Sequence, residues 1–195
     1  MVMRSQLCKI ATLSTLLAWC TLALPCTPLS AQTVIDPVFG LSVTPPAGYA
    51  ARLLTLMPSQ YAMIAVQRNQ FENAGCLIEF RIENTGSSRT QDEYNQRAGK
   101  AEWIEKVRNE VGARYDIHTI DPIEHAGVRG TAIAGDRHYK VAENVTRMRK
   151  LTREWYVILD TTKGRTTVEC AALRSEFEER QVEFEATLRT VSLPK

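Results

Sequence analysis

Residues 155–172 read Trp155-Tyr-Val-Ile-Leu-Asp-Thr-Thr-Lys-Gly-Arg-Thr-Thr-Val-Glu-Cys-Ala-Ala172, and this stretch decides the fold class. On both sides of Thr161-Thr-Lys-Gly164, apolar or small side chains recur at every second position, which is the period of a strand with one buried face. The central segment ends in glycine and is typical of a turn between two antiparallel strands. The pattern therefore predicts a β-hairpin, with Cys170 late in its second strand and on the inward face.

A second strong strand pattern lies earlier, at Cys76-Leu-Ile-Glu-Phe-Arg-Ile-Glu83. Cys76, Ile78 and Phe80 fall on one face of this segment, whereas Glu79 and Arg81 fall on the other. We therefore expect Cys76 to point into the core. Further extended segments are predicted at residues 39–43, 61–67, 117–120, 127–134 and 145–149, with breaks at Asp121-Pro122 and Gly135-Asp136.

Two helices are predicted, each preceded by residues that can cap it. Thr90 and Glu93 form a capping box, and one long helix with an apolar stripe is expected from there to Tyr115, about six turns. A second capping box at Ser175 and Glu178 precedes a C-terminal helix, with an apolar stripe of Phe177, Phe184, Leu188 and Val191. Strands in hairpins with two helices predict an α+β fold, in which an antiparallel sheet carries a long central helix and a C-terminal helix as an α/β/α sandwich.

Residues 1–31 have the composition of a cleavable signal peptide. Arg4 and Lys9 precede the mostly apolar segment 10–24, and small residues up to Ala31 mark the expected cleavage site. A transmembrane anchor is disfavoured, because the apolar run is about fifteen residues long and a membrane span needs about 20. We therefore expect a single domain, residues 32–195, that is periplasmic or secreted and has no transmembrane segment after cleavage.

Cysteine usage changes once the signal is removed. Cys8, Cys20 and Cys26 would leave with it, so Cys76 and Cys170 remain. An even pair in an exported chain predicts one disulfide, and two buried free thiols are the alternative. Lipid attachment at Cys20 or Cys26 is disfavoured, because a large residue or proline precedes each of them.

The net charge argues against a nucleic-acid partner. The chain has 24 basic and 22 acidic residues, and two of the basic ones, Arg4 and Lys9, lie in the expected signal. The rest of the chain is therefore formally neutral, and it lacks the basic field that is typical of nucleic-acid-binding proteins.

One local basic cluster remains in the sequence. On an extended strand, Arg147, Arg149 and Arg153 would share a face that could bind an anionic partner. The alternative is a solvated sheet face whose arginines pair with acidic neighbours such as Glu143 and Glu154.

The expected mature chain contains none of the common catalytic or cofactor-binding motifs, so the sequence predicts no catalytic residue and no cofactor. His118, Asp121, Glu124 and His125 are weak candidates for metal ligands. Pro122 is expected to divide them between two short strands joined by a turn, which would separate their side chains. An enzyme is therefore less favoured than a non-catalytic binding protein.

The order of these elements resembles a known family. The residues that suggest it are Phe39-Gly-Leu-Ser-Val43, Pro45-Pro-Ala-Gly-Tyr49, the helix from Thr90, the hairpin around Gly164 and the ending Phe184-Glu-Ala-Thr-Leu-Arg-Thr-Val-Ser-Leu193. They resemble the family that groups the photosystem II extrinsic PsbP proteins with Mog1-like and DcrB-like α/β/α sandwiches. The resemblance implies a small exported domain that docks on or assists another protein, and no functional residue is carried over from it.

Together these observations predict an exported, periplasmic, non-catalytic binding or accessory protein that docks on a protein or envelope component. A small metal-dependent hydrolase and a small-molecule-binding protein are the alternatives. The sequence does not name the partner.

Overall fold

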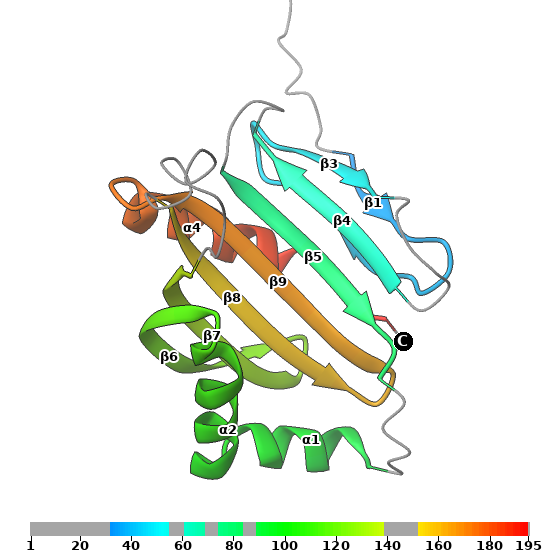
Figure 1. Cartoon of the computed structure of the whole chain (residues 1–195). Helices are drawn as coiled ribbons and strands as arrows, with labels where there is room; N and C mark the ends of the chain where they lie inside the picture. The colour runs from blue at the N-terminus through cyan, green and yellow to red at the C-terminus, as the bar shows by residue number, and fades with distance from the viewer. Residues whose placement is uncertain (1–31, 55–60, 69–73, 84–88, 139–151, 195) are drawn as a thin grey trace, which may run out of the picture.

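The computed structural model describes residues 32–54, 61–68, 74–83, 89–138 and 152–194. At its centre is a seven-stranded sheet in which every neighbouring pair of strands is antiparallel. The strands lie in the order β3 (Ala50–Leu53), β4 (Tyr61–Gln67), β5 (Gly75–Arg81), β9 (Gly164–Leu173), β8 (Thr152–Thr161), β7 (Val128–Arg137) and β6 (Tyr115–His125) (Figure 1).

Helices cover the sheet from both sides. Successive side chains of a strand point to opposite faces of the sheet, so the residues of β8 belong alternately to two cores, one on each face. Trp155 and Val157 pack with helix α4 (Phe177–Arg189) on one face, whereas Ile158 packs with helices α1 (Gln91–Ala98) and α2 (Ala101–Gly112) on the other. The α+β fold with an α/β/α arrangement is therefore confirmed.

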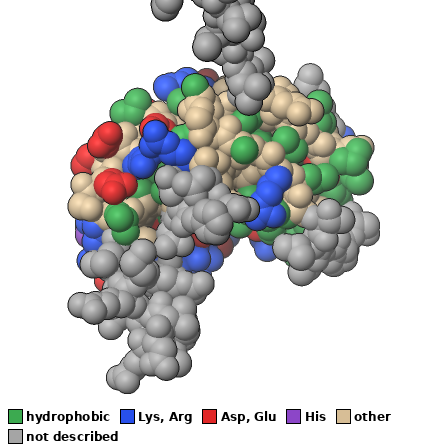
Figure 2. Space-filling model, turned by 90° about the horizontal axis from the view of Figure 1, so that it is seen from above, with side chains coloured by type: hydrophobic (Ala, Val, Ile, Leu, Met, Phe, Trp, Pro, Cys, Tyr) green, Lys and Arg blue, Asp and Glu red, His purple; other side chains and the backbone are tan. Residues whose placement is uncertain are grey.

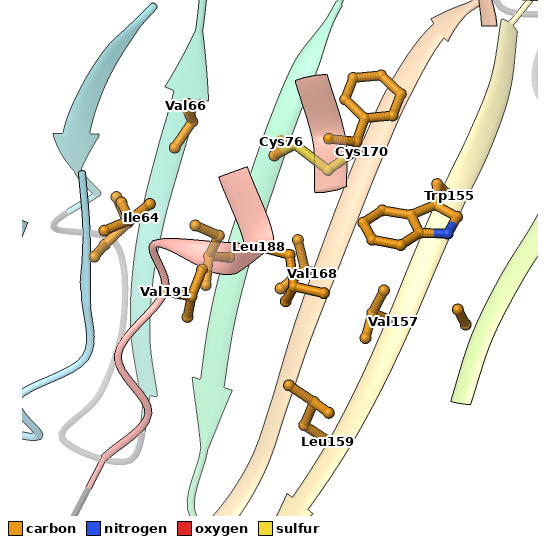
Figure 3. Close-up of a cluster of buried hydrophobic side chains, with 14 of the residues drawn as sticks. Ile64, Val66, Cys76, Trp155, Val157, Leu159, Val168, Cys170, Leu188 and Val191 are labelled. Atoms are coloured by element: carbon orange, nitrogen blue, oxygen red, sulfur yellow. A yellow bond between two sulfur atoms is a disulfide. The ribbon is translucent and has the colours of Figure 1, made fainter. Parts of the chain in front are cut away.

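The larger core lies between the sheet and α4. Phe177, Phe184 and Leu188 of α4 are almost fully buried against the inward residues of β5, β8 and β9. Figure 3 shows Leu188 beside Val168 of β9. Burying a side chain of this size contributes about 2 kcal/mol, so the stripe of the C-terminal helix stabilises the whole layer. The short strands β1 (Val34–Ile35) and β2 (Ser42–Val43) pair with each other and add Leu41 and Val43 to the same core.

The predicted disulfide lies within this core. Cys76 and Cys170 face each other in the register of β5 and β9, and their sulfur atoms are 2.02 Å apart (Figure 3). Both cysteines are buried, and they lie 94 positions apart in the sequence. The bond therefore links two adjacent central strands.

The prediction of a single long helix from Thr90 is wrong. The capping box at its start is present, since the Glu93 amide donates to Thr90 Oγ1 and the Thr90 amide donates to Glu93 Oε2. However, α1 ends at Ala98 with Gly99 as its C-cap, and Lys100 has an extended backbone with ψ of 143° before α2 begins. The break turns α2 away from the direction of α1, so that α1 packs mainly on β7 and α2 mainly on β6 (Figure 1).

The strand break expected at Asp121-Pro122 is also wrong. β6 is continuous from Tyr115 to His125, and Pro122 pairs with Thr131 of β7. Proline is tolerated there because β6 is an edge strand, whose other side has no ladder partner among the described strands. β7 likewise runs on to Arg137, through the break expected at Gly135-Asp136.

Smaller differences concern the ends of elements. Helix α4 begins after Glu176 without a side-chain cap, so the capping box expected at Ser175 does not form. Strand β3 was not predicted, and β1 lies in a segment that showed no strand pattern.

Two predictions lie outside the described residues: the signal peptide, residues 1–31, and the strand at residues 145–149. No described helix is both long and apolar enough to cross a membrane.

Candidate functional site

One part of the sheet has no cover on one side. Helices α1 and α2 lie over β6, β7 and β8, whereas no described element lies over β3, β4 and β5 on that side (Figure 1). We call the side chains that β4 and β5 present there the open face. They alternate with the core residues of the same strands and comprise Tyr61, Met63, Ala65, Gln67, Leu77, Glu79 and Arg81.

A cavity of about 360 Å³, the α2 pocket, lies where the open face meets the C-terminal end of α2. Strands β5, β8 and β9 form its floor, and α2 with the residue that follows its C-cap forms one wall. Charged residues of both signs dominate the lining, which consists of Glu79, Arg81, Glu110, Arg114, Tyr156, Arg165, Thr167 and Glu169.

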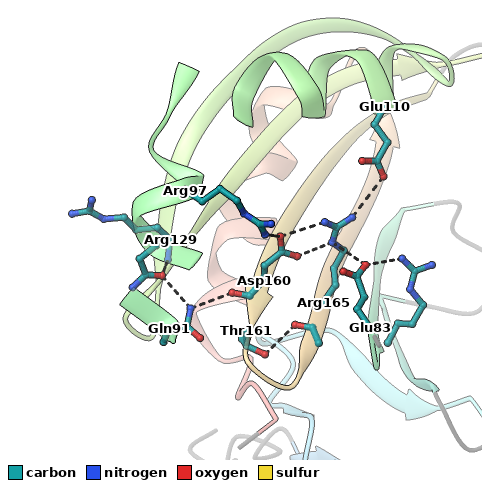
Figure 4. Close-up of polar contacts among 11 residues, drawn as sticks. Glu83, Gln91, Arg97, Glu110, Arg129, Asp160, Thr161 and Arg165 are labelled. Carbon is teal, nitrogen blue, oxygen red and sulfur yellow. Dashed lines mark hydrogen bonds and ion pairs between the residues drawn. The ribbon is translucent and has the colours of Figure 1, made fainter. Parts of the chain in front are cut away.

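Arg165 is the centre of one ion-pair network in the pocket. Its Nε lies 2.7 Å from Asp160 Oδ1 and 3.5 Å from Glu83 Oε1, and its Nη1 lies 3.6 Å from Glu110 Oε1 (Figure 4). Asp160 also binds Arg97 of α1 at 2.8 Å, so the network joins α1 and α2 to the sheet. Burial lowers the pKa of Arg165, but the hydrogen bond to Asp160 and the nearby carboxylates outweigh it and raise the pKa above its ordinary value. Arg165 therefore stays charged.

A second network lies around Arg137. Its guanidinium binds Glu154 at 3.1 Å and Glu169 at 2.6 Å, and Tyr115 donates a hydrogen bond to Glu154 at 2.6 Å. Burial is the main reason that the pKa of Tyr115 is raised. Burial likewise raises the pKa of Glu169, although the Arg137 charge opposes the rise. Glu169, the pocket acid in this network, is thus held by a buried arginine.

Two charged lining residues have no such partner. Among the described residues, neither Arg114 nor Glu79 forms an ion pair or a side-chain hydrogen bond. The Arg114 guanidinium lies instead above the rings of Tyr115 and Tyr156, at 5.9 and 5.8 Å from their centres. The pocket thus combines fixed ion pairs with one carboxylate, Glu79, and one cation, Arg114, that form no ion pair among the described residues, although the charge of Arg114 also lowers the pKa of Glu169.

The structure places the two candidate histidines in different contacts. His118 Nε2 is 3.0 Å from Asp136 Oδ2, whereas His125 Nε2 hydrogen-bonds to the backbone carbonyl of Val191 at 2.7 Å. The reason predicted for their separation, a turn at Pro122, is wrong, because both lie on the continuous strand β6.

The two candidate carboxylates, Asp121 and Glu124, do not form a metal site with the histidines. Glu124 lies 3.6 Å from Arg129 on the neighbouring strand, and Asp121 pairs in register with Ala132. The described part of the chain holds no group of three or more His, Cys, Asp or Glu side chains arranged to bind a metal ion.

The structure describes only Arg153 of the predicted basic face, since Arg147 and Arg149 lie outside the described residues. Arg153 binds Asp136 at 3.1 Å and lies above the ring of Phe177. It does not pair with its neighbour Glu154, because adjacent residues of a strand point to opposite faces. Figure 2, seen from above, shows no extended patch of a single charge among the described residues on that side of the molecule.

The sequence patterns did not reveal the α2 pocket. The alternation in β5 correctly placed Glu79 and Arg81 on the polar side of their strand. However, no motif or spacing connects them with Arg114 or Tyr156, because these residues come together only through the order of the strands and the path of α2.

Comparisons with known proteins bear on the fold. No protein-family model matches the chain, and no curated protein sequence matches it either. The solution structure of cyanobacterial PsbP (CyanoP) from Synechocystis sp. PCC 6803 superposes with a TM-score of 0.52, covering 88% of this chain and 97% of that chain. The fold is PsbP-like. This PsbP-like fold confirms the resemblance inferred from the sequence, but at 8% identity the likeness concerns the fold alone and assigns no role to the pocket residues.

Proposed function

We propose that this protein is an exported, non-catalytic binding module that docks on a protein or another envelope component through its open face. The observation that carries the proposal is the absence of any described element over β3, β4 and β5 on the α2 side of the sheet. A sheet face of this kind is otherwise expected to pack against another layer.

The composition of the open face supports a docking role. Half-buried Met63 and Leu77 lie beside half-buried Glu79 and exposed Arg81. A mixture of apolar and charged side chains is typical of interfaces that form and dissociate, whereas obligate interfaces are more apolar. The face therefore suits a partner that binds reversibly.

The disulfide supports a location outside the cytoplasm. Disulfides persist in oxidising compartments such as the bacterial periplasm and are rare in cytosolic proteins. The bond between buried Cys76 and Cys170 agrees with the signal peptide predicted for residues 1–31.

In the two networks, the protonation states of Tyr115, Arg137 and Arg165 favour a positioning role over acid–base catalysis, whereas burial raises the pKa of Glu169 above its ordinary value. General acids and bases work best with a pKa near the operating pH. Burial raises the pKa of Tyr115 further above its ordinary value. In spite of burial, the pKa of Arg137 is raised by its hydrogen bond to Tyr115 and by nearby carboxylates, and that of Arg165 by its hydrogen bond to Asp160 and by nearby carboxylates. These groups therefore hold one protonation state and serve to position the elements.

Site-specific photo-crosslinking in the native envelope tests the docking proposal. A photoreactive residue at Met63 or Leu77 should give an adduct of defined mass, because both side chains lie on the open face. The same residue at Val182, which is 64% exposed on α4, is the matched control. Absence of an adduct at the open face, or equal adducts at Val182, would overturn the proposal.

A further inference from the structure

We propose that the α2 pocket binds a small zwitterion, a free α-amino acid or a dipeptide, with its carboxylate on Arg114 and its ammonium group on Glu79. This inference goes beyond the docking function, because it requires no partner protein. It identifies a ligand site from the charges that the fold leaves without partners inside a cavity.

The charge arrangement of the pocket selects a ligand with both signs. Arg165 is already matched by Asp160, and Glu169 is matched by Arg137. Arg81 pairs with Glu83 at 2.9 Å. A simple anion would leave the Glu79 carboxylate without a partner, and a simple cation would leave Arg114 without one. A zwitterion satisfies both groups at once.

The sheet register places the two groups at a suitable separation. Glu79 is opposite Thr167 of β9, and Thr167 is opposite Ile158 of β8. Tyr156, which lies under Arg114, is two residues from Ile158 and on the same face. With strands about 4.8 Å apart and residues spaced about 3.4 Å along them, Glu79 and Tyr156 are about 12 Å apart at the backbone. The side chain of Glu79 and a small zwitterionic ligand bound to the Arg114 guanidinium can together span this distance.

The size and the remaining lining fit such a ligand. A volume of about 360 Å³ is at the lower end of the range for small-molecule sites. The hydroxyl groups of Tyr156 and Thr167 line the cavity without a hydrogen-bond partner among the described residues. They can therefore bind the polar atoms of a peptide bond or of a polar side chain.

Calorimetric titration of the purified protein tests the proposal with the common L-α-amino acids and the dipeptide Ala-Ala, each added separately. At least one of them should bind with saturable heat. For that compound, Glu79→Gln and Arg114→Gln should each weaken binding at least tenfold. Arg108→Gln, on the exposed side of α2, is the matched control and should leave affinity unchanged.

Derivatives of the ligand test the charge requirement separately from the protein variants. The N-acetyl form lacks the ammonium group and the amide form lacks the carboxylate, so each should bind at least tenfold more weakly than the parent compound. The proposal is overturned if no compound of the panel binds. It is also overturned if acetate or either derivative binds as tightly as the parent, or if both pocket variants retain full affinity.

Failure of this site can be distinguished from failure of the docking function. Neither Met63 nor Leu77 lines the pocket, although Met63 is opposite Glu79 in the register. A crosslink from these positions to a protein or another envelope component therefore reports on docking and not on a bound amino acid. Thermal melting of Glu79→Gln should match the parent protein. Arg114→Gln should melt only slightly lower, because it loses the contacts of the guanidinium with the rings of Tyr115 and Tyr156 but no ion pair of the networks described above.

Discussion

Cys76 and Cys170 occupy directly opposed positions on β5 and β9, with their Cα atoms 4.0 Å apart. The disulfide between them closes a loop that contains α1, α2 and strands β6 to β8. It therefore links two neighbouring strands that lie far apart in the sequence.

Replacing both cysteines with alanine should lower the free energy of unfolding by about 4 kcal/mol, because the open chain regains the entropy that a long closed loop removes. Urea denaturation without reductant measures the loss. Reductant should destabilise the parent protein by a similar amount and leave the double variant unchanged. A loss below about 1 kcal/mol would contradict the entropic role assigned to the bond.

Asp160→Ala should destabilise the protein by about 3 kcal/mol, because it removes a carboxylate that binds two arginines from a nearly buried position. The side chain of Asp160 is 9% exposed, and that of Arg165 is 14% exposed. Glu105→Ala is the control, since Glu105 forms only an exposed pair with Arg108 and should show no measurable change. Equal effects in the two variants would show that the network does not stabilise the fold.

Gly164→Ala should cost about 2 kcal/mol in the free energy of unfolding. Gly164 has φ of +149° in the β8–β9 turn, and a Cβ atom there would lie 2.2 Å from the carbonyl oxygen of Arg81. Gly99→Ala is the comparison, because Gly99 has ordinary backbone angles and no atom closer than 3.9 Å to an added Cβ. Thermal or chemical unfolding of the two variants should differ clearly, and similar stabilities would refute the steric argument.

Asp136→Asn should change how stability depends on pH. Burial raises the pKa of Asp136, but hydrogen bonds from Arg153 and His118 outweigh it and hold the pKa below its ordinary value. A carboxyl group with a lower pKa in the folded state stabilises the protein above its unfolded pKa, and this contribution is lost as the pH falls through the folded value. The variant should therefore be less stable than the parent at pH 7, and the difference should shrink below about pH 4.

Urea denaturation between pH 7 and pH 3 measures this change. Asp116→Asn is the control, because the side chain of Asp116 is 75% exposed, and its effect should be small at every pH. A difference between Asp136→Asn and the parent protein that stays constant over this range would contradict the assigned shift.

The sequence predicted strands and helices best where periodicity is strong and uninterrupted. The β8–β9 hairpin, the inward direction of Cys76 and the buried stripe of α4 follow from local patterns. The pattern failed at Lys100 and Pro122, where the outcome depends on packing. The apolar stripe continues through Lys100, but the helix is interrupted there, and the two halves pack on different strands. Pro122 is tolerated because its strand is at the edge of the sheet.

By itself, the amino-acid sequence determined the fold class, the pair of cysteines available for a disulfide and the polar character of Glu79 and Arg81. These properties depend on the order of apolar and charged residues within a few positions. Only the tertiary structure decided which strands are neighbours, which side of the sheet stays open and that Arg114 meets Glu79 in one cavity. The physical reason is that strand register and helix packing bring together residues that are far apart in the chain. The periodic pattern of apolar residues within one segment contains no information about such contacts.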